Sequence, residues 1–470
     1  MLFSSHTNSL SAHLNLLDQT ECRYLITSSN TVVSDILAQR DMKHVIAPEL
    51  SELLAETTIR HFPFTKTFPE AQHDPFLILH TSGSTGLPKP VTFTHAVVAA
   101  QDAHSAIEPF ADEEAQRLGW QRQNWTHLMH GRFTSPFAPF HVIMALPVLM
   151  YTVFGSSTYV YASRQTLPDT SAVMLAAESC DTAWLSPSIL ESIAANSLWL
   201  HIIGKLQHVV YGGGALVNGV GDRISQYTRL INKFGTTELG GLLLSGQVAP
   251  HDWEYILFDP QLNGIEWRAN SSFSARDGNQ PYKMVIVADR EIAFLQSVFK
   301  VFPQENEYAT GDLWTKHPRK ANLWRYAGRV DDLICFNHGI KFHPKGVEDK
   351  LKENAFIDEA LMFGDKHEQP VLLVELSGQE LALIEDEKQQ SVYHSVEDLI
   401  EQMNQELPSI ARIKKTHVVY ASGGKRFSRA TKGTVMRFHT FLIFKEDIDH
   451  CYAEHGDTAA KMLERLEHDG

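Results

Sequence analysis

The chain is poor in cysteine, and its few cysteines form no recognisable pattern. Cys22, Cys180, Cys335 and Cys451 lie far apart, and none belongs to a CxxC motif. This spacing excludes a zinc ribbon and a disulfide-stapled scaffold, and it is typical of thiols in a reducing compartment. The sequence therefore predicts a cytoplasmic protein whose four cysteines stay reduced.

Long hydrophobic runs and metal-ligand spacings are also missing. Polar residues interrupt residues 1–20, which lack a basic start followed by an apolar core, and no other segment reaches membrane-spanning length. The 24 histidines are scattered, without HExxH or a comparable spacing. We therefore expect no secretory signal, no membrane span and no transition metal.

Positive charge is scarce relative to negative charge. The 41 Lys and Arg residues face 56 Asp and Glu residues, which gives a formal net charge of −15. General nucleic-acid binders usually carry a basic face, so we expect no nucleic-acid partner. The 470 residues, of which 43% are hydrophobic, suffice for more than one hydrophobic core.

The stretch HTSGSTGLPKPV, residues 80–91, has the composition of a phosphate-binding loop. It follows residues 75–79, whose apolar run predicts a buried strand, and it precedes a helical pattern with Thr94 as its N-cap. Glycines allow close backbone approach, while hydroxyls, amides and one cation suit phosphate oxygens. The residues concerned are Thr81, Ser82, Gly83, Ser84, Thr85, Gly86 and Lys89. A flexible surface linker is the alternative, and a Walker loop is excluded because Lys89 lies between two prolines.

Strand and helix patterns alternate further along the chain. Residues 181–196 predict a strand, a turn and an amphipathic helix, and residues 206–211 predict a strand that leads into Gly212, Gly213 and Gly214. Such alternation is typical of an α/β fold with a parallel or mixed sheet. The glycines do not match GxGxxG, because Val217 occupies its sixth position, so we expect no nicotinamide site.

Three motifs, taken in order, resemble those of the adenylate-forming superfamily. This superfamily comprises acyl-CoA synthetases, luciferases and the adenylation domains of non-ribosomal peptide synthetases. The motifs are TSGSTGLPK (81–89), INKFGTTELGG (231–241) and the segment from ATGDLW to GRVDD (309–332). The segment LWRYAGRVDDLICFNHGIKFHPKGVE is especially similar to fungal adenylate-forming reductases.

The resemblance implies an α/β architecture with two domains. A large N-terminal domain of mixed β-sheets with packed helices would be followed by a small, mobile α+β lid domain. We expect the large domain at residues 1–329, the lid at 330–446 and a helical tail at 447–470. The leader before the phosphate loop is shorter than members usually have, and its own sequence suggests two strands and a helix but no chemistry.

The resemblance also implies how ATP and Mg²⁺ are bound. Gly212, Gly213 and Gly214 resemble the wall against which adenine packs. Phe234 with Gly235 resembles the aromatic that stacks on adenine, and Thr236 and Thr237 resemble the hydroxyls at the α-phosphate. Glu238, with Thr85 of the loop, resembles the magnesium site. A turn bounded by glycines, with Glu238 in solvent, is the alternative.

Three further roles follow from the third motif. Asp312 resembles the carboxylate that accepts hydrogen bonds from both ribose hydroxyls. Arg329 resembles the arginine that contacts the ribose or phosphate, and Asp331 the hinge about which the lid turns. Outside such a motif, Asp and Arg would usually form a surface ion pair of little consequence.

Residues 137–141, FAPFH, resemble the family's motif at the acid-binding pocket, which implies that His141 lies near the substrate carboxylate. A structural histidine is the alternative. Members that activate amino acids usually carry an Asp in this region, where it pairs with the α-ammonium group. Its absence favours a carboxylic acid without an α-amine, such as an aryl, fatty or α-keto acid.

The catalytic lysine of the family usually follows a glycine and stabilises charge at the α-phosphorus. In RFSRATKGTVMRF, residues 426–438, Lys432 precedes Gly433 instead. We expect Lys432 to act from this shifted register, with Lys425 as the fallback. A solvated loop cation is the alternative.

The resemblance implies ATP-dependent activation of a carboxylic acid to an acyl-adenylate with release of pyrophosphate, then transfer to a thiol. The segment after Arg437 contains no serine for a phosphopantetheine arm, and no reductase unit is recognised. We therefore expect the thiol in trans, from CoA or the phosphopantetheine of a carrier protein. The alternatives are a degenerate nucleotide-binding relative that serves as a scaffold, and a luciferase-like oxygenase.

Overall fold

The computed structural model describes most of the chain and omits parts of several loops and the C-terminal end. The described residues are 1–5, 8–28, 33–55, 60–81, 88–108, 113–118, 122–123, 128–138, 140–162, 170–214, 216, 218–246, 248–270, 280–320, 322–336, 341–365, 367–377, 386–422, 424–430 and 433–455.

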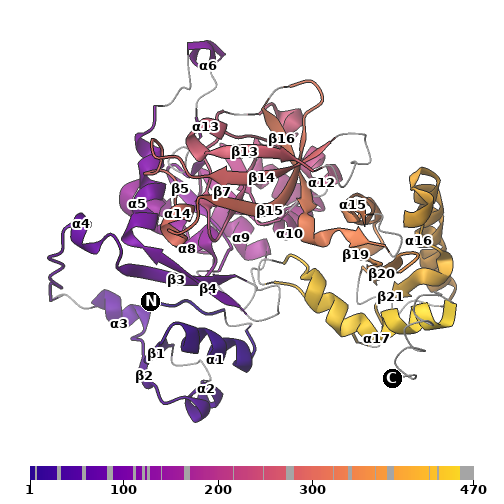
Figure 1. The fold of residues 1–470 in the computed structure, drawn as a ribbon, viewed down its shortest axis with the longest axis horizontal. Coiled ribbons are helices and arrows are strands. Elements are labelled where there is room, and N and C mark those ends of the chain that lie inside the picture. Colours follow the sequence, from indigo (N-terminus) through magenta and orange to yellow (C-terminus); the bar gives the residue numbers. More distant parts are fainter. Residues whose placement is uncertain are drawn as a thin grey trace.

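A five-stranded parallel sheet forms the centre of the large domain (Figure 1). Its strands, in spatial order, are β6 (Thr158–Tyr159), β5 (Arg132–Thr134), β7 (Thr182–Leu185), β8 (His208–Tyr211) and β9 (Leu230–Asn232). Alternate residues of one strand enter different cores: Val209 packs in one hydrophobic cluster and Val210 in another. This period of two is that of a strand buried on both faces.

Helices supply many of the other members of both cores. The first core contains residues of α9 (Thr170–Ala177), α10 (Pro187–Ala194), α11 (Ser197–Ile203) and α12 (Asn218–Ile224). The second contains residues of α8 (Val142–Leu149) and the π-helical turn η2 (Met150–Phe154). Helix α10 begins as its sequence predicts, with Ser186 as N-cap and Pro187 in the first turn. The predicted α/β architecture is confirmed.

A second five-stranded sheet, which is antiparallel, carries the third motif. Its strands, in spatial order, are β12 (Tyr255–Leu257), β16 (Leu323–Arg329), β15 (Glu307–Lys316), β14 (Pro281–Val287) and β13 (Ile265–Ala269). Its aromatic core is centred on Trp314, which is fully buried. Three short elements connect the two sheets: β10 (Gly235–Thr236), β11 (Gly240–Gly241) and η3 (Pro250–Asp252). Two short helices connect strands of the second sheet: α13 (Pro260–Asn263) and α14 (Val298–Val301).

The N-terminal part forms a smaller layer beside the hairpin that carries the phosphate loop. This layer comprises α1 (Leu10–Gln19), β1 (Tyr24–Thr27), α2 (Ser34–Gln39), β2 (Lys43–Ile46), α3 (Leu50–Ala55) and α4 (Phe68–Ala71). The hairpin consists of β3 (Pro75–Thr81) and β4 (Lys89–Thr94), followed by α5 (His95–Ala103), η1 (His104–Ala106) and α6 (Glu113–Leu118). The strand expected at residues 75–79 is confirmed. Thr94 precedes α5 as expected, although its side chain makes no capping hydrogen bond.

The lid is a separate α+β unit, seen at the right of Figure 1 in orange and yellow. It comprises η4 (Val330–Asp332), β17 (Ile334–Cys335), β18 (Lys341–Phe342), α15 (Lys345–Leu351), β19 (Ile357–Phe363), β20 (Val371–Leu376), α16 (Asp386–Glu406), η6 (Ser409–Ala411), η7 (Lys415–His417), β21 (Val418–Tyr420) and α17 (Arg437–His455). Helices α15 and α16 pack on one face of its three-stranded sheet, and α17 packs on the other.

Two helices of the lid extend across positions where the sequence suggests a boundary. Helix α16 begins at Asp386, so Ser395 lies inside it, where its hydroxyl meets the Asn354 amide at 3.3 Å. Ser395 and Asp398 have the spacing of a capping box, but they lie within α16 and mark no helix start. Helix α17 spans residues 446 and 447, where the lid was expected to give way to a tail, and the expected domain bounds stay a prediction.

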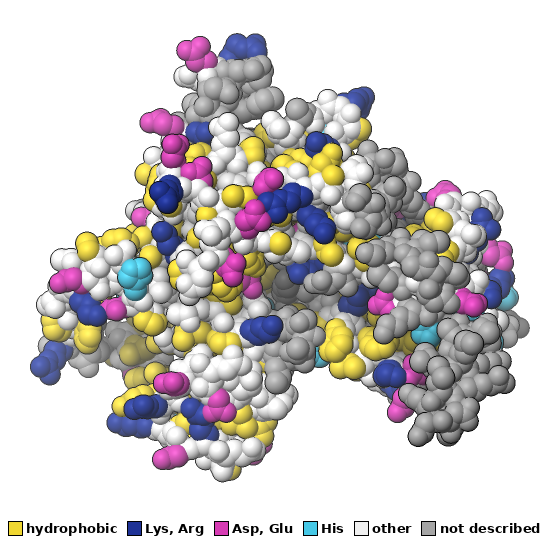
Figure 2. All heavy atoms as spheres, viewed as in Figure 1, with side chains coloured by type: hydrophobic (Ala, Val, Ile, Leu, Met, Phe, Trp, Pro, Cys, Tyr) yellow, Lys and Arg dark blue, Asp and Glu magenta, His cyan; other side chains and the backbone are white. Residues whose placement is uncertain are grey.

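The surface carries interspersed charges and exposed hydrophobic side chains. On the face seen in Figure 2, basic and acidic side chains alternate, and hydrophobic side chains gather over the N-terminal layer. The exposed large hydrophobic residues in this part of the chain are Tyr24, Ile26, Val45, Ile46, Leu50, Leu53, Leu54, Phe62, Phe64 and Phe68. In the described ranges, none of the helices combines the length and apolarity that crossing a membrane requires.

Candidate active site

The two domains enclose a large cleft of about 2360 Å³. Trp184, Tyr211 and Asn232, at the carboxyl ends of the parallel strands β7, β8 and β9, lie on its wall. The carboxyl ends of parallel strands are where α/β folds usually bind ligands. The lid closes the opposite side with residues of α15 and of the segment that leads into α17.

The predicted phosphate loop connects the two strands of the β3–β4 hairpin. Thr81 and Lys89 are register partners at its base, so the loop leaves and re-enters the sheet at one point. The Asn15 amide donates to the carbonyl oxygen of Pro88 at 3.0 Å, which holds one end of the loop against α1. Ser82, Gly83, Ser84, Thr85 and Gly86 lie outside the described residues, and their phosphate contacts stay a prediction.

The N-terminal leader, whose sequence suggests no chemistry, reaches this cleft. Ser5, Asn8 and Ser9 line the cleft. The Ser5 amide donates to Nε2 of His80 at 3.1 Å, so that nitrogen acts as the acceptor. Burial lowers the pKa of His80 to about 4, and the ring is neutral at physiological pH. No motif in the leader signals this contact, because it is made by the backbone.

The three glycines after β8 allow close packing at the cleft. A Cβ at Gly212 would lie 2.6 Å from the carbonyl oxygen of Lys233, which is closer than side chains permit. A Cβ at Gly214 would lie 2.8 Å from Cγ2 of Thr434, a lid residue. Gly212, Gly213 and Gly214 all line the cleft. The glycine run therefore brings β9 and the lid close to the end of β8.

The second motif forms the β10–β11 turn and the residues before it. The Phe234 ring lies edge-to-face with Trp314 at a centroid distance of 4.9 Å, and it also lines the cleft. Tyr308 lies near Thr236 and Glu238, and burial together with the Glu238 charge raises the pKa of Tyr308 to about 12. Sequence reasoning missed Tyr308, whose place opposite Glu238 depends on the pairing of strands.

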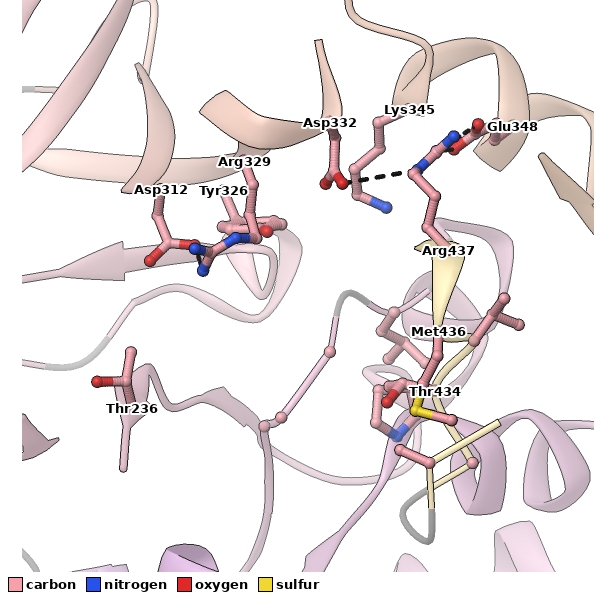
Figure 3. Close-up of a pocket in the computed structure, with 18 of the residues that line it drawn as sticks. Thr236, Asp312, Tyr326, Arg329, Asp332, Lys345, Glu348, Thr434, Met436 and Arg437 are labelled. Carbon is pink, nitrogen blue, oxygen red and sulfur yellow. Dashed lines mark hydrogen bonds and ion pairs between the residues drawn. The ribbon is translucent and has the colours of Figure 1, made fainter. Parts of the chain in front are cut away.

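Asp312 and Arg329 of the third motif lie side by side at the cleft, and their roles toward a nucleotide stay a prediction. They are direct register partners on β15 and β16, and the guanidinium Nη1 lies 3.5 Å from Oδ1 of Asp312 (Figure 3). Asp312 is 3% exposed, whereas the side chain of Arg329 is 42% exposed toward the cleft. Gly311, which precedes Asp312 on β15, has a φ of +78°, and a Cβ there would meet Nη2 of Arg329 at 2.8 Å. The pair forms a fixed polar corner of the cleft.

The expected acid-binding segment lies at the start of α8. The His141 carbonyl accepts the first helical hydrogen bonds, from the amides of Met144 and Ala145 at 2.9 Å each. Its ring packs beside Phe140 at 4.7 Å between centroids, and both residues line the cleft. This arrangement gives His141 a structural task at the helix start and also places it on the cleft wall.

The hairpin at residues 428–436 brings the lid to the large domain. Arg429 and Val435 form a β-bridge, and the Gly433 amide donates to the Ala430 carbonyl at 2.8 Å. Gly433 has a φ of +85°, and a Cβ there would lie 2.6 Å from Oγ of Ser188 on α10. Lys432 itself lies outside the described residues. Its neighbour Gly433 nevertheless places this turn at the cleft, beside the end of β8.

The fallback cation Lys425 is engaged elsewhere. Its Nζ lies 2.5 Å from Oδ2 of Asp447 and over the ring of Phe444 at 5.8 Å, both on α17. Lys425 is not among the residues that line the cleft. In this arrangement of the domains, Lys425 therefore serves the lid rather than the cleft.

An ion-pair network joins this hairpin to the domain junction (Figure 3). Arg437, the first residue of α17, donates to both oxygens of Glu348 at 2.5 and 2.6 Å and to the Met362 carbonyl at 2.9 Å. Its Nε lies 3.5 Å from Asp332, in the turn η4 where Asp331 is also found. Sequence reasoning missed this network, since its members are far apart in the chain.

Comparisons with known proteins agree with this arrangement. Residues 6–258 match the family described as AMP-binding enzyme, and residues 331–456 match its AMP-binding enzyme C-terminal domain. A carboxylic acid reductase of Neurospora crassa is 30% identical over 459 residues, which are 96% of this chain and 42% of that protein. The adenylate-forming reductase Nps9 of Serpula lacrymans is 26% identical, over 96% of this chain and 41% of that protein. The chain thus spans less than half the length of these relatives.

Solved structures give the same fold. ATP-bound MatB from Rhodopseudomonas palustris superposes with a TM-score of 0.67 at 13% identity, over 95% of this chain and 84% of that chain. A benzoate CoA ligase from Burkholderia xenovorans LB400 gives a TM-score of 0.62 at 16% identity, over 93% and 83%. With the family match over more than half of its length, this chain belongs to the adenylate-forming AMP-binding enzymes.

Proposed function

We propose that this chain activates a carboxylic acid with ATP to give an acyl-adenylate and pyrophosphate. The observation that carries this proposal is the meeting of three motif-bearing elements at one cleft. The Asp312–Arg329 corner, the glycines after β8 and the lid turn next to Lys432 all reach it. The family membership supports the same reaction class.

Each side chain has a task in this reaction. The buried Asp312 carboxylate accepts hydrogen bonds from the ribose hydroxyls, and Arg329 beside it faces the phosphates. Phe234 and the glycines from Gly212 hold adenine, while the ammonium of Lys432 stabilises the charge that develops as carboxylate attacks the α-phosphorus. His141 orients the attacking carboxylate.

The residues at the β10–β11 turn fit a magnesium ion. Mg²⁺ is usually bound by one or two carboxylates together with substrate phosphates and water, and Glu238 supplies one partly buried carboxylate on the cleft wall. When bound, the ion neutralises phosphate charge that would otherwise repel the attacking acid. Glu238 with Thr85 is the proposed ligand set.

The acid and the acceptor are part of the proposal too. The segment around Phe137 offers no carboxylate for an α-ammonium group, which supports an acid without an α-amine. After adenylation, the lid turns about Asp331, and a thiol of CoA or of a carrier protein takes the acyl group. The free thiols of Cys22, Cys180 and Cys451 support a reducing, cytoplasmic setting.

Acid-dependent exchange of labelled pyrophosphate into ATP tests the first half-reaction. The purified chain is offered aryl, fatty, α-keto and amino acids, and we expect exchange with a non-amino acid. ATP binding at saturation without exchange across this panel would instead identify a nucleotide-binding scaffold. Release of AMP only when CoA or a carrier protein with a free phosphopantetheine thiol is added would establish the thiol step.

A further inference from the structure

A buried lysine lies on the wall of the cleft. Lys233 directly follows β9, lines the cleft and is 9% exposed. Its Nζ donates to the carbonyl oxygen of Leu242, just after the β10–β11 turn. A buried ammonium group is costly unless a counter-charge accompanies it, so its presence requires an explanation.

The surrounding polar groups do not supply that counter-charge. The Gln101 amide donates to Oγ of Ser297 at 2.6 Å and accepts from the Gly241 amide at 3.0 Å. His104 meets the Leu295 carbonyl at 3.1 Å, and burial lowers its pKa to about 4, so the neutral ring supplies no counter-charge. Among the described residues, no carboxylate forms an ion pair with Lys233.

The Lys233 ammonium therefore has two donors for which the described residues give no acceptor, since the group carries three N–H bonds. Burial lowers the pKa of Lys233 to about 7, so the group gains a proton readily when an anion arrives. A structural role alone does not account for this arrangement, because an apolar side chain of similar length would fill the space without the cost of burying charge.

The Lys233 amine and the lid turn next to Lys432 lie at different places on the cleft wall. The lid turn next to Lys432 packs on Ser188 and Gly214, on the β8 side of the cleft. The Lys233 amine lies instead against Gly241 and Leu242, next to Gln101 of α5. An acid whose reactive end faces the lid turn would direct its other end toward Lys233.

We propose that Lys233 pairs with a second anionic group at the far end of the substrate, which makes the activated acid a dicarboxylic acid. This inference rests on the proposed adenylation and adds the substrate class. Charge-assisted hydrogen bonds from a buried ammonium to a carboxylate would satisfy both the lysine donors and the second carboxylate.

Matched acids of equal length test this specificity. The pairs are succinic and butyric acid, adipic and hexanoic acid, and terephthalic and 4-methylbenzoic acid, each tested by pyrophosphate exchange. In at least one pair we expect kcat/KM to favour the dicarboxylic acid by about 30-fold or more, as buried charge pairs do. Lys233→Met should remove that preference chiefly through KM and leave ATP affinity unchanged.

Two further variants complete the test. Lys205→Met makes the same change at an exposed lysine outside the cleft and should preserve the preference. Lys233→Glu should reverse it, so that 4-(aminomethyl)benzoic acid is favoured over terephthalic acid. A wild-type enzyme that prefers the methyl-ended acid in every pair, or a Lys233→Met enzyme with an unchanged preference, overturns the inference.

Failure of the adenylation proposal is distinguished by direct binding. If no acid supports exchange, calorimetric titration with each acid pair, in the presence of a non-hydrolysable ATP analogue, still reports the preference of the site. Tighter binding of a dicarboxylic acid that Lys233→Met abolishes upholds the role of Lys233, whereas equal binding within every pair rejects it.

Discussion

Asp312 and Arg329 show how the fold positions single residues in the proposed nucleotide site. Their pairing follows from strand register, and Gly311 leaves space for the guanidinium group. The sequence motif predicted both residues, because each lies inside a recognisable pattern. Lys233 and Tyr308 were not predictable in this way, since burial of a lysine or tyrosine depends on which loops pack over it.

Asp312→Asn keeps the shape of the side chain and removes its charge. We expect ATP to bind at least about tenfold more weakly, since hydrogen bonds to charged groups contribute about 1.5–3 kcal/mol. Calorimetric titration with ATP measures the change. Asp289→Asn, at an exposed carboxylate, is the matched control and should bind ATP as the wild type does. Equal affinity in both variants would show that Asp312 does not contact the nucleotide.

Lys233 should make stability depend on pH in a defined direction. Its pKa is about 7 in the folded chain and near 10.4 in an unfolded chain, so between these values the unfolded chain binds more protons. The free energy of unfolding should therefore rise with pH through this window, by up to about 1.4 kcal/mol per pH unit from this group. Urea unfolding of the wild type and Lys233→Met, from pH 7 to 9.5, should show a shallower slope in the variant. Parallel slopes would mean that Lys233 keeps an ordinary pKa.

Elements with strong local patterns were predicted more reliably than elements defined by pairing. The strand at Pro75 and the helix after Thr94 both follow their hydrophobic periodicity. Strand β4 was missed although Val91 and Phe93 are buried in alternation, because the lysine and prolines before it suggested a loop. The order of the antiparallel sheet could not be derived, since it depends on contacts distant in sequence.

The ion pairs of Arg437 with Glu348 on α15 and with Asp332 at the domain junction hold the hairpin at residues 428–436 in position. Arg437→Met should destabilise the lid by about 3–5 kcal/mol, because it leaves the buried Glu348 carboxylate without its cation. Hydrogen exchange of lid amides, recorded across a denaturant series, measures this loss in the free energy of unfolding. Adding Glu348→Gln removes the uncompensated charge while keeping an acceptor for the Met362 amide, so the double variant should recover part of the stability. A double variant as unstable as the sum of the two single changes contradicts this explanation.

At the scale of the whole molecule, the two domains meet where the glycine run and the lid turn pack together. Thr434 from the lid lies against Gly214 of the large domain, and Gly433 lies against Ser188. The cleft is complete only when both domains contribute to its wall. Adenylation should therefore require this contact between the domains in addition to the residues that each domain contributes.

Gly214→Ala tests that contact with the smallest possible change. The added methyl group would lie 2.8 Å from Cγ2 of Thr434, so the lid turn must shift. We expect pyrophosphate exchange to fall about tenfold, in line with the cost of overpacking. Thr434→Ser removes Cγ2 and should restore exchange in the double variant. If the double variant stays impaired while its ATP affinity has also fallen, Gly214 acts on the nucleotide and not on the lid.

The measurement that tests the adenylation proposal most directly is acid-dependent ATP–pyrophosphate exchange in three proteins: the wild type, Lys432→Ala and Lys425→Ala. We expect exchange in the wild type with an acid that lacks an α-amine. Lys432→Ala should lose it by at least about a hundredfold, as the removal of a group that stabilises transition-state charge usually does, and should still bind ATP. Lys425→Ala, whose lysine is held by Asp447, should retain exchange. Exchange that survives Lys432→Ala, or saturating ATP binding without exchange for any acid, would contradict the proposed active site.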